Sequence, residues 1–572
     1  MKNGLLFIVA LFSLMSVTLS GYSQQWGLYT LYATKNGTKA YLVDTADVAA
    51  TYKTWTFASN KKSAYSAYLI PGDTLVRTYT YTASGGMTGG GVTGGVQKVD
   101  WGGNTTWDFQ YNSSTYTLHH DICPMPNGNV LMIAYELKTS AEATQAGATT
   151  TVSIKSEKLM EVRQTGPTTG VVVWEWHLWD HLCQNNNPAK DNYVTSIIDN
   201  PQLLNINYTP GQDKTDRWHM NGVDYNEELD QIAISMHFMN SVFVIDHSTT
   251  TAEAAGHTGG IYGKGGDFLY RWGNPASFGA TGTAVFSTIH DAHWVPNDNP
   301  NYPGYLCGYN NAGGTGGKTA VDIWLPPYDG DSYTMNPGVA TLPSTYAYQY
   351  NSSFSASNEG NSQQLPNGNM LVNNAFGSVY EINSAGTVLW SKATSSSHCY
   401  RFTKCQVRGP IASASSSATS VNEGNPVTLN SSAVSVTETS PTYSYAWSSG
   451  ENTQNPTIYP AVSGTYIVTI TNTALGCSDT ASVYIEVLGT SVSETEATSA
   501  IEIYPNPSTG MIHISNMAEE DYSIIVMDIY GKTICQGDRL SEVDLSSNEN
   551  GIYLIQVITG NQKTVKKIIL LK

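Results

Sequence analysis

Short apolar runs rich in β-branched and aromatic residues alternate with polar turns through most of the chain. Examples are VLMIAYE, DQIAIS, YLCGY and MLVNNA, and Gly, Asn and Asp separate such runs. Runs of this length between turn residues are typical of short strands. The pattern therefore predicts an all-β protein.

Two sequence elements recur between residues 24 and 410. The first is a strand, a turn and a strand that ends in tryptophan, at Trp107, Trp176, Trp272 and Trp390. The second has a polar start, a hairpin turn and an apolar strand, as in HDICPMPNGNVLMIAYE, HMNGVDYNEELDQIAIS, HDAHWVPNDNPNYPGYLCGY and GNSQQLPNGNMLVNNA. Repetition of this kind predicts the four-stranded blades of a β-propeller, and the length favours six blades over seven.

The pattern changes after Pro410, where the Ser/Ala-rich linker IASASSSATS begins. Beyond it, VTLNSS, YSYAWSSG, GTYIVTITNT and ASVYIEV form strands spaced as in a small β-sandwich, which we expect over residues 411–489. The strand rhythm and the YAWSSG segment resemble the immunoglobulin-like and PKD-like modules of bacterial surface proteins.

A second linker, SVSETEATSA, precedes YPNPSTG, a GIY strand and a basic last strand. These motifs resemble the C-terminal sorting domain that directs Bacteroidetes proteins through type IX secretion. The resemblance implies a small β-sandwich over residues 490–572, the type IX machinery as a partner, and a cell-surface or secreted location. It also implies that this tail is not catalytic.

The first residues predict export as well. Lys2, an apolar run from Leu5 to Leu19, and the small residues Gly21 and Ser23 are typical of a signal peptide, which we place at residues 1–23. The mature chain is then expected to be soluble or attached to the cell surface.

Charge and cysteine content bear on the possible partners and on disulfide pairing. Charged residues make up 13% of the chain and the net charge is −18, which argues against nucleic acid as a partner because binding it requires a basic surface. The chain has seven cysteines, an odd number, so at least one thiol is unpaired within the chain. Cys399 and Cys405 are the only two that lie near each other in the sequence.

Three histidines share one position in the second element. His120, His219 and His290 each lie six residues before the residue that opens the turn, and Gly360 takes this position in the fourth copy. Equivalent positions in propeller blades are related by rotation about the central channel, so the three imidazoles are predicted to converge there. A packed structural role and a catalytic zinc site remain alternatives.

Neighbouring polar residues are expected to face elsewhere. Asp121 and Asp291 directly follow their histidines, and successive strand residues point to opposite faces, so both are expected to cap a turn or bind backbone. His293 is expected on the face away from His290. Trp294 shares the His290 face and is a candidate for the substrate pocket, with core packing as the alternative.

Several segments together resemble the bacterial arylsulfotransferases, which transfer sulfuryl groups between phenols without a nucleotide donor. These segments are HHDICPMPNGN, VVVWEWHLWDHLCQ, RWHMNGVDYNEELDQIAIS, GDFLYRWGNP and STIHDAHWVPNDN, within residues 101–408. The resemblance implies a six-bladed propeller whose channel binds a phenolic sulfate, passes the sulfuryl group to a histidine and delivers it to an acceptor phenol. It places the nucleophile at His290 and assisting histidines at His219 and His120, with His119 as the other occupant of the last position.

The chain departs from the family at one catalytic position. The family arginine is expected after the strand that follows WHMNGV, where this chain has His237. Arginine is always charged, whereas histidine is charged only in part near neutral pH. It is therefore open which side chain binds the sulfonate oxygens in this chain. Candidates to compensate are Arg217, Arg271 and Arg401, of which we assign Arg271 to substrate binding, with an ordinary surface or strand role as the alternative for each. His181, in WDHLCQ, is expected on a loop at the channel mouth, with a structural cap as the alternative.

The predicted function is therefore an exported aryl-sulfate sulfotransferase that acts by a ping-pong mechanism through a sulfohistidine. Its partners would be a phenolic sulfate donor and an acceptor phenol. No metal or other cofactor is required by this scheme, and the chain has no GxxxxGK[ST] phosphate loop. The alternatives are a binding or adhesion propeller without catalysis, and a metal-dependent hydrolase or lyase that uses the three histidines.

Overall fold

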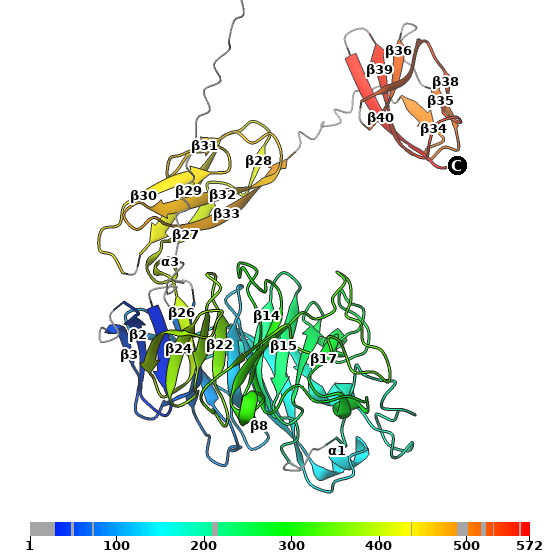
Figure 1. The fold of residues 1–572 in the computed structure, drawn as a ribbon. Helices are drawn as coiled ribbons and strands as arrows, with labels where there is room; N and C mark the ends of the chain where they lie inside the picture. Colours follow the sequence, from blue (N-terminus) through cyan, green and yellow to red (C-terminus); the bar gives the residue numbers. More distant parts are fainter. Residues whose placement is uncertain are drawn as a thin grey trace, which may run out of the picture. The chain divides into compact units, whose positions relative to one another are not determined.

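The computed structural model describes residues 29–46, 51–70, 74–208, 215–435, 437–488, 501–515, 522–529, 531–559 and 562–572. The expected signal peptide lies outside these residues. Nearly all regular structure in the described part is β-strand, as the sequence predicts (Figure 1). No described helix is both long enough and apolar enough to pass through a membrane.

Six four-stranded antiparallel sheets fill the region from Tyr29 to Phe402. In hydrogen-bonded order they are β4 (Ser63–Ile70), β5 (Thr74–Thr80), β6 (Gly94–Val99) and β7 (Thr105–Gln110); β8 (Tyr116–Pro124), β9 (Val130–Lys138), β10 (Ile154–Gln164) and β11 (Gly170–His177); β14 (Met220–Asn226), β15 (Gln231–Met236), β16 (Ser241–Asp246) and β17 (Tyr270–Trp272); β18 (Ile289–Trp294), β19 (Leu306–Asn310), β20 (Ala320–Trp324) and β21 (Tyr348–Asn351); β22 (Asn361–Gln364), β23 (Met370–Asn373), β24 (Ser378–Ile382) and β25 (Val388–Ala393); and β26 (Ser396–Phe402), β1 (Tyr29–Thr34), β2 (Lys39–Asp44) and β3 (Thr51–Thr56).

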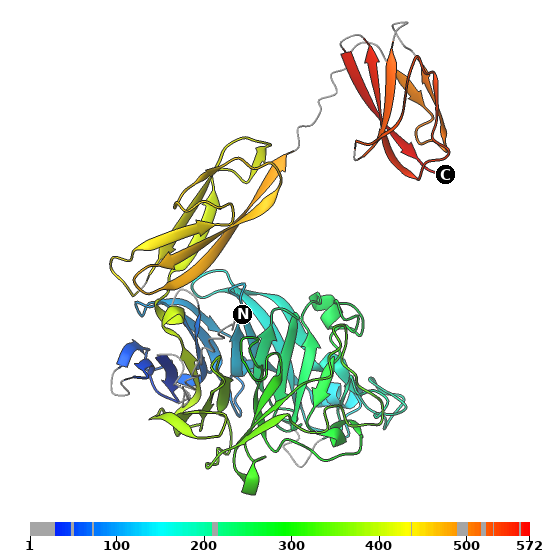
Figure 2. The same cartoon turned by 45° about the horizontal axis from the view of Figure 1, so that its top comes forward.

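The sheets form a closed ring. The first strand of each sheet, as ordered above, contacts the first strand of the next, from β4 through β8, β14, β18 and β22 to β26, and β26 contacts β4 again. The sheets stand side by side in both views (Figures 1 and 2). Hereafter β4, β8, β14, β18, β22 and β26 are called the inner strands.

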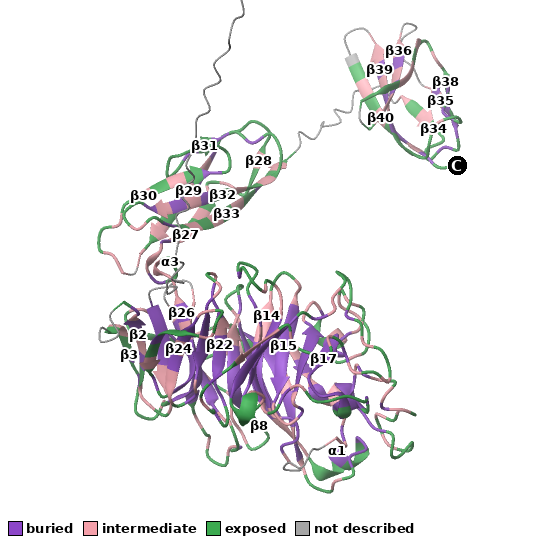
Figure 3. Ribbon diagram, in the orientation of Figure 1, coloured by how far each residue is buried: buried purple, intermediate pink, exposed green. Residues whose placement is uncertain are grey.

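Apolar packing between neighbouring sheets explains the long hydrophobic runs. Every residue of β15 and β16 is buried, because both faces of their sheet are covered by other sheets. Figure 3 shows the strand β15 coloured as buried. Both strands are therefore continuously buried, without the alternation of exposed and buried residues that a one-sided sheet shows.

The recurring tryptophans join adjacent sheets. Each of the four predicted from the sequence lies on the last strand of its sheet and is buried. Three of them donate their indole N–H to a backbone carbonyl that precedes the last strand of the next sheet: Trp107 to Thr169 at 3.0 Å, Trp176 to Gly266 at 2.7 Å and Trp272 to Pro343 at 2.6 Å. Trp55 on β3 does the same to Asp100 at 3.0 Å. The repeated tryptophan is thus a repeated link between sheets.

Two further groups of strands follow. Residues 411–488 hold the sheet β27 (Ile411–Ser416), β29 (Val427–Val434), β31 (Thr457–Ile458) and the sheet β28 (Ser420–Asn422), β33 (Cys477–Leu488), β32 (Gly464–Asn472), β30 (Tyr443–Trp447). Residues 502–570 hold the sheet β34 (Glu502–Tyr504), β35 (Met511–Ser515), β38 (Glu542–Asp544) and the sheet β37 (Thr533–Asp538), β36 (Ser523–Asp528), β39 (Gly551–Thr559), β40 (Gln562–Leu570). The last group encloses its own apolar core.

The disulfide does not join Cys399 and Cys405, the two cysteines that lie near each other in the sequence. Cys405, in α3 (Lys404–Arg408), is bonded to Cys477 at the start of β33, with sulfurs 2.10 Å apart. Cys399 is a free, buried thiol on β26, beside the hydroxyl of Ser396 at 2.9 Å. Cys399 lies within β26, whereas Cys405 lies in α3, which follows it. The nearness of these two cysteines in the sequence therefore did not indicate the disulfide partner of Cys405.

Candidate functional site

Histidines from different sheets gather where the inner strands meet. The ring centroids of His120 and His219 are 4.6 Å apart, those of His219 and His237 are 5.4 Å apart, and those of His237 and His290 are 5.2 Å apart. His120 lies on β8, His219 directly before β14, His237 directly after β15 and His290 on β18. The structure therefore brings together the four histidines singled out in the sequence.

Bulges in the inner strands aim these side chains. The backbone is left-handed at His120 (φ 52°) and His219 (φ 56°), and the pairing register of both inner strands shifts nearby. In β18 the left-handed residue is Asp291 (φ 52°), one position after His290. The three histidines are thus not equivalent in backbone conformation. A bulge redirects a side chain, and the bulge in each inner strand brings its histidine to the common site.

Asn311 fixes the protonation of His290. The amide nitrogen of Asn311 donates to the carbonyls of Ala356 and Glu359, at 3.0 and 2.8 Å, so its oxygen accepts the Nδ1–H of His290 at 2.6 Å. The Nε2 atom of His290 then carries the lone pair, and it accepts the backbone N–H of Glu359 at 3.2 Å. Burial, followed by the charge of His237, holds the pKa of His290 well below its usual value. His290 is therefore a neutral imidazole near pH 7.

His219 is oriented by a carboxylate. Its Nδ1 lies 2.7 Å from Asp216 Oδ2 and 3.0 Å from the Tyr135 hydroxyl, which also donates to Asp216 at 3.2 Å. Burial opposes ionisation of Asp216, yet the hydrogen bond and charge of His219 hold the pKa of this carboxyl below its usual range. The ionised carboxylate can stabilise positive charge that forms on His219 during a reaction.

His119 lies behind His120 as its support. The two Nδ1 atoms are 2.9 Å apart, and the His119 ring stacks on Tyr135 with centroids 3.5 Å apart. Nε2 of His119 lies 2.9 Å from Glu157, whose pKa is raised well above its usual value by burial and then by the charge of Asp216. Burial also lowers the pKa of both histidines well below 6.5. His119 has no exposed surface, and its ring lies edge-on to that of His120 with centroids 5.2 Å apart.

His237 does not supply the charge of the expected arginine. Burial, followed by the charge of His219, lowers its pKa to about 4. Its backbone N–H pairs with the carbonyl of His219 at 3.0 Å, which fixes its place between His219 and His290. Near neutral pH the side chain is therefore uncharged.

Three further residues, not singled out in the sequence, join the site. His398 on β26 and Tyr65 on β4 have ring centroids 4.6 Å apart, and Tyr65 lies 5.0 Å from His120. Lys35 reaches in from the β1–β2 turn, with Nζ 2.7 Å from Glu359 and 5.6 Å from the Tyr65 ring centroid. We call His120, His219, His237, His290 and His398 the histidine cluster. Alignment of SSSHCYRF as a further inner strand would have indicated His398.

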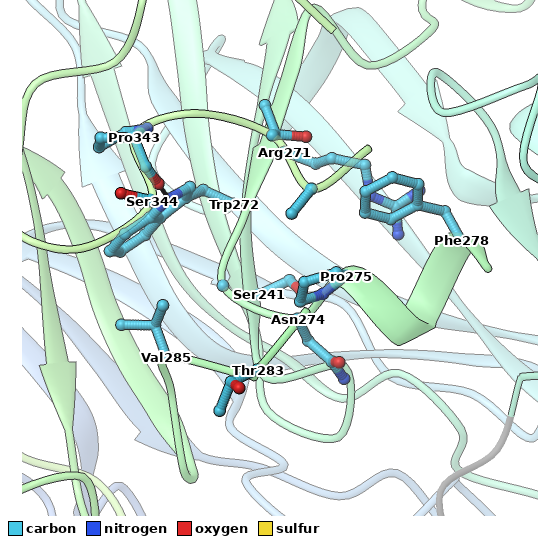
Figure 4. A pocket seen from close by; sticks show the side chains of 13 residues that line it. Ser241, Arg271, Trp272, Asn274, Pro275, Phe278, Thr283, Val285, Pro343 and Ser344 are labelled. Atoms are coloured by element: carbon cyan, nitrogen blue, oxygen red, sulfur yellow. Dashed lines mark hydrogen bonds between the residues drawn. The ribbon is translucent and has the colours of Figure 1, made fainter. Parts of the chain in front are cut away.

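The remaining sequence candidates lie elsewhere. Arg271 is buried beside Phe278 and Trp272 at a separate small pocket (Figure 4), and it donates to the carbonyls of Pro201 and Leu203 and to Ser277. Arg217 donates to the Ile206 carbonyl and Arg401 pairs with Glu381. These three arginines are thus used in structural contacts with backbone carbonyls, Ser277 and Glu381.

Trp294, His181 and His293 also have other partners. Trp294 is buried in an apolar core with Trp272 and Trp324. His181 is fully buried, and it bonds to Asp267 and to the carbonyl of Ala254 at the end of α2 (Thr251–Ala254). His293 bonds to Gln364 at 2.6 Å, away from the cluster. Asp291 and Asp121 bind the backbone N–H groups of Ser362 and Ile122, as expected for their positions.

A glycine-rich loop between β5 and β6 covers the cluster. The backbone N–H of His120 donates to Gly91 at 2.7 Å, and a Cβ at Gly90 would lie 3.0 Å from His219. Gly91 has φ 67°, and a Cβ there would collide with the His120 ring. Only 1% of His290 and 3% of His120 is exposed. The loop therefore packs directly against two members of the cluster, His120 and His219.

The histidine cluster does not have the close ligand spacing of a metal site. Within the part of the chain that the structure describes, one group of three His, Cys, Asp or Glu side chains has all its ligand atoms within 4.8 Å of one another. That group is His181, His257 and Asp267, outside the cluster.

A comparison with family models identifies the C-terminal part of the chain. Residues 502–571 match the model of the secretion system C-terminal sorting domain, which indicates export by the type IX system and surface attachment or release. Among curated proteins there is no match.

Three solved structures have limited similarity. BamB from Moraxella catarrhalis has 12% identity and a TM-score of 0.26 over 64% of this chain and 74% of its own. A putative 6-phosphogluconolactonase from Bacteroides fragilis has 10% identity and a TM-score of 0.32 over 66% and 96%. A luciferin-regenerating enzyme has 10% identity and a TM-score of 0.28 over 63% and 86%.

The region that contains the ring and the histidine cluster matches a family model. Residues 17–439, more than half of the chain, match the model of the arylsulfotransferase (ASST) family. The chain belongs to the arylsulfotransferase family.

Proposed function

We propose that the protein is an exported aryl-sulfate sulfotransferase that works by a ping-pong mechanism through a sulfated histidine. The observation that carries this proposal is the meeting of His120, His219, His237 and His290 inside the ring, in a chain of this family. We assign the six sheets as the blades of a six-bladed propeller over residues 24–410. Residues 411–489 are assigned as an Ig-like or PKD-like sandwich and 490–572 as the sorting domain.

In the first half-reaction His290 is the nucleophile. Nε2 leaves its 3.2 Å contact with the Glu359 N–H and attacks the sulfur of the phenolic sulfate, in line with the aryl oxygen. An N–S bond forms as the S–O(aryl) bond breaks, and the departing phenolate takes a proton from His219 held against Asp216. Asn311 keeps Nδ1 protonated and so leaves the nucleophilic lone pair on Nε2.

The second half-reaction reverses these steps. His219 takes the proton of the acceptor phenol, whose oxygen attacks the sulfur and breaks the N–S bond. His290 is released as a neutral imidazole, and the phenolic sulfate product leaves. One residue thus serves as acid and then as base, as reversibility requires.

Lys35 is proposed to hold the sulfonate oxygens in place of the absent arginine. Its Nζ lies by Tyr65, which contacts His120, and by Glu359, which contacts His290. An ammonium near the transferring group stabilises charge on the peripheral oxygens, although as a point charge and not as a planar fork.

Nitrophenyl sulfate with a phenol acceptor tests the proposal. We expect nitrophenol release that depends on the acceptor, persists with chelator and is accompanied by a sulfated protein in intact mass spectrometry. His290→Asn should abolish release and sulfation, whereas His293→Asn, on the same strand but bonded to Gln364, should retain both.

The same assay separates the alternatives. No turnover with any aryl sulfate would favour a binding or adhesion propeller, which the loss of the arginine makes reasonable. Loss of turnover with chelator would favour a metal-dependent hydrolase or lyase. Release without any acceptor phenol would show water to be the acceptor.

A further inference from the structure

Three potential metal ligands converge outside the histidine cluster. Asp267 Oδ1 lies 2.8 Å from Nδ1 of His181 and 2.7 Å from Nδ1 of His257. His181 belongs to the short helix η1 (Leu178–His181), His257 follows α2 (Thr251–Ala254) and Asp267 precedes β17. We propose that these three side chains bind one divalent transition-metal ion of the zinc type.

The hydrogen bonds of His181 leave its Nδ1 facing a carboxylate oxygen. Its Nε2 lies 2.9 Å from the carbonyl of Ala254, which can only accept, so Nε2 carries a hydrogen. A neutral His181 then has its lone pair on Nδ1, directed at a carboxylate oxygen that also has only lone pairs. Two acceptors at 2.8 Å repel each other unless a proton or a metal ion lies between them. An imidazole that donates its other N–H to a carbonyl is also the usual arrangement of a metal-bound histidine.

The surrounding segments hold the ligands in place. The His181 ring is parallel to Trp176, with centroids 5.4 Å apart, and Trp176 donates to the Gly266 carbonyl at 2.7 Å. Gly266 also closes the loop that carries His257, since its N–H donates to Gly256 at 3.0 Å. A Cβ at Gly266 would lie 2.5 Å from His181 Nε2, so glycine is needed for this close approach. The ligands come from segments that are fixed independently of any ion.

The donor set selects the class of metal. Two imidazole nitrogens and one carboxylate oxygen suit Zn²⁺, Co²⁺ or Ni²⁺, whereas Ca²⁺ and Mg²⁺ prefer oxygen ligands alone. With bonds of about 2.0–2.2 Å the ligand atoms would lie somewhat more than 3 Å apart, so the three groups need only a small outward movement. The His257 side chain is 59% exposed, which leaves water access to the fourth position. The ion would cross-link η1 to the segment between α2 and β17.

Metal titration of the full chain tests this site. Protein stripped with chelator should bind one Zn²⁺ per chain by calorimetry, and Co²⁺ should give the visible absorption bands of a four-coordinate site. His257→Ala and Asp267→Asn should each weaken binding at least about tenfold. The first change is at an exposed residue and the second nearly preserves shape, so both variants are expected to fold.

His177→Ala is the matched control, because His177 lies near two carboxylates, Glu136 and Glu175, but in no such three-ligand group. It should bind the ion as the unaltered chain does. Absence of binding would show that a proton bridges these groups and would overturn the proposal. Binding that survives both ligand variants would place the ion elsewhere and would overturn it equally. The readout is metal binding, so it is independent of sulfotransfer.

Discussion

At the scale of single residues, the proposed function requires the site to hold an anion without the arginine that the family resemblance implies. His237 stands where that resemblance places the arginine, and burial lowers its pKa to about 4, so it adds no charge near pH 7. The lysine at position 35 lies within reach of two residues that contact the cluster, Tyr65 and Glu359. Charge at this site thus depends on a residue from the β1–β2 turn.

We therefore predict that Lys35→Met lowers kcat/KM for an aryl sulfate at least about 100-fold, and that Lys35→Arg retains most activity. Lys53→Met, at a lysine over Trp101 outside the cluster, should leave kcat/KM unchanged. Removal of Lys35 also leaves Glu359 without its ion-pair partner. If Lys35→Met with Glu359→Gln recovers full activity, Lys35 only neutralises Glu359 and does not hold the sulfonate.

The same burial makes stability depend on pH through His237. Its pKa is about 4 in the folded state and about 6.5 in the unfolded chain. Between these values the unfolded chain binds more protons, so the free energy of unfolding falls as pH falls from 6.5 to 4. Compared with His237→Asn, the unaltered chain should lose up to about 3 kcal/mol more over this interval. Urea unfolding at several pH values measures this, and equal pH dependence in both proteins would contradict it.

The sequence predicts the site histidines that lie in a repeated motif. It does not predict site residues that lie outside such a motif. His120, His219 and His290 were found because each precedes a recognisable hairpin turn. Tyr65 and Lys35 carry no such mark, since their places depend on a bulge in β4 and on a turn pairing with Ser395. Arg271 was chosen because arginine suits sulfonate, but its guanidinium is used by backbone carbonyls.

At the scale of elements, tryptophans on the last strands join neighbouring sheets. Trp107 donates its indole N–H to Thr169, whereas the indole nitrogen of Trp390 has no hydrogen-bond partner among the described residues. Both side chains are buried. Trp107→Phe removes a hydrogen bond and volume, whereas Trp390→Phe removes volume, a buried unpaired N–H and part of the ring that lies 4.5 Å from the Arg401 guanidinium.

We expect Trp107→Phe to lower the free energy of unfolding by about 1–2 kcal/mol more than Trp390→Phe does. Chemical denaturation of both variants provides the comparison. Equal losses would mean that the repeated tryptophan acts only through apolar packing.

The glycine-rich loop is the element that packs against His120 and His219. Gly91 (φ 67°) and Gly85 (φ 70°) have nearly the same backbone conformation, but a Cβ at Gly85 meets nothing within 4 Å. Gly91→Ala should displace His120 and lower kcat at least about tenfold beyond Gly85→Ala. Turnover of nitrophenyl sulfate by the two variants tests this, and equal rates would show that the loop does not constrain His120.

The sequence predicted the hairpins and the tryptophans of the last strands because both depend on local residue types, although Trp107 and Trp390 lie within their strands and not at the ends. It did not predict the bulges. His120 and Asp291 have a left-handed backbone although neither position is a glycine, so no residue type in the sequence marks these bulges. The disulfide was equally inaccessible, because Cys405 and Cys477 are 72 residues apart.

At the scale of the whole molecule, the ring is closed by pairing of its two ends. β26 pairs antiparallel with β1 from Tyr29 opposite Phe402 to Thr34 opposite Ser396. The strand that closes the ring also carries His398. Closure and assembly of the histidine cluster therefore depend on the same segment.

This arrangement predicts different results for two truncations of the chain. A chain that ends at Gly409 keeps all six sheets and the histidine cluster, so it should retain most turnover of nitrophenyl sulfate. A chain that ends at Thr394 lacks β26, exposes the edge of β1 and leaves β4 and β22 without their common neighbour. We expect that shorter chain to be inactive and to lose cooperative thermal unfolding. If instead the Gly409 chain also lost its cooperative transition, the ring would depend on the strands beyond residue 410 and on the Cys405–Cys477 bond, and the catalytic region could not be assigned to residues 24–410 alone.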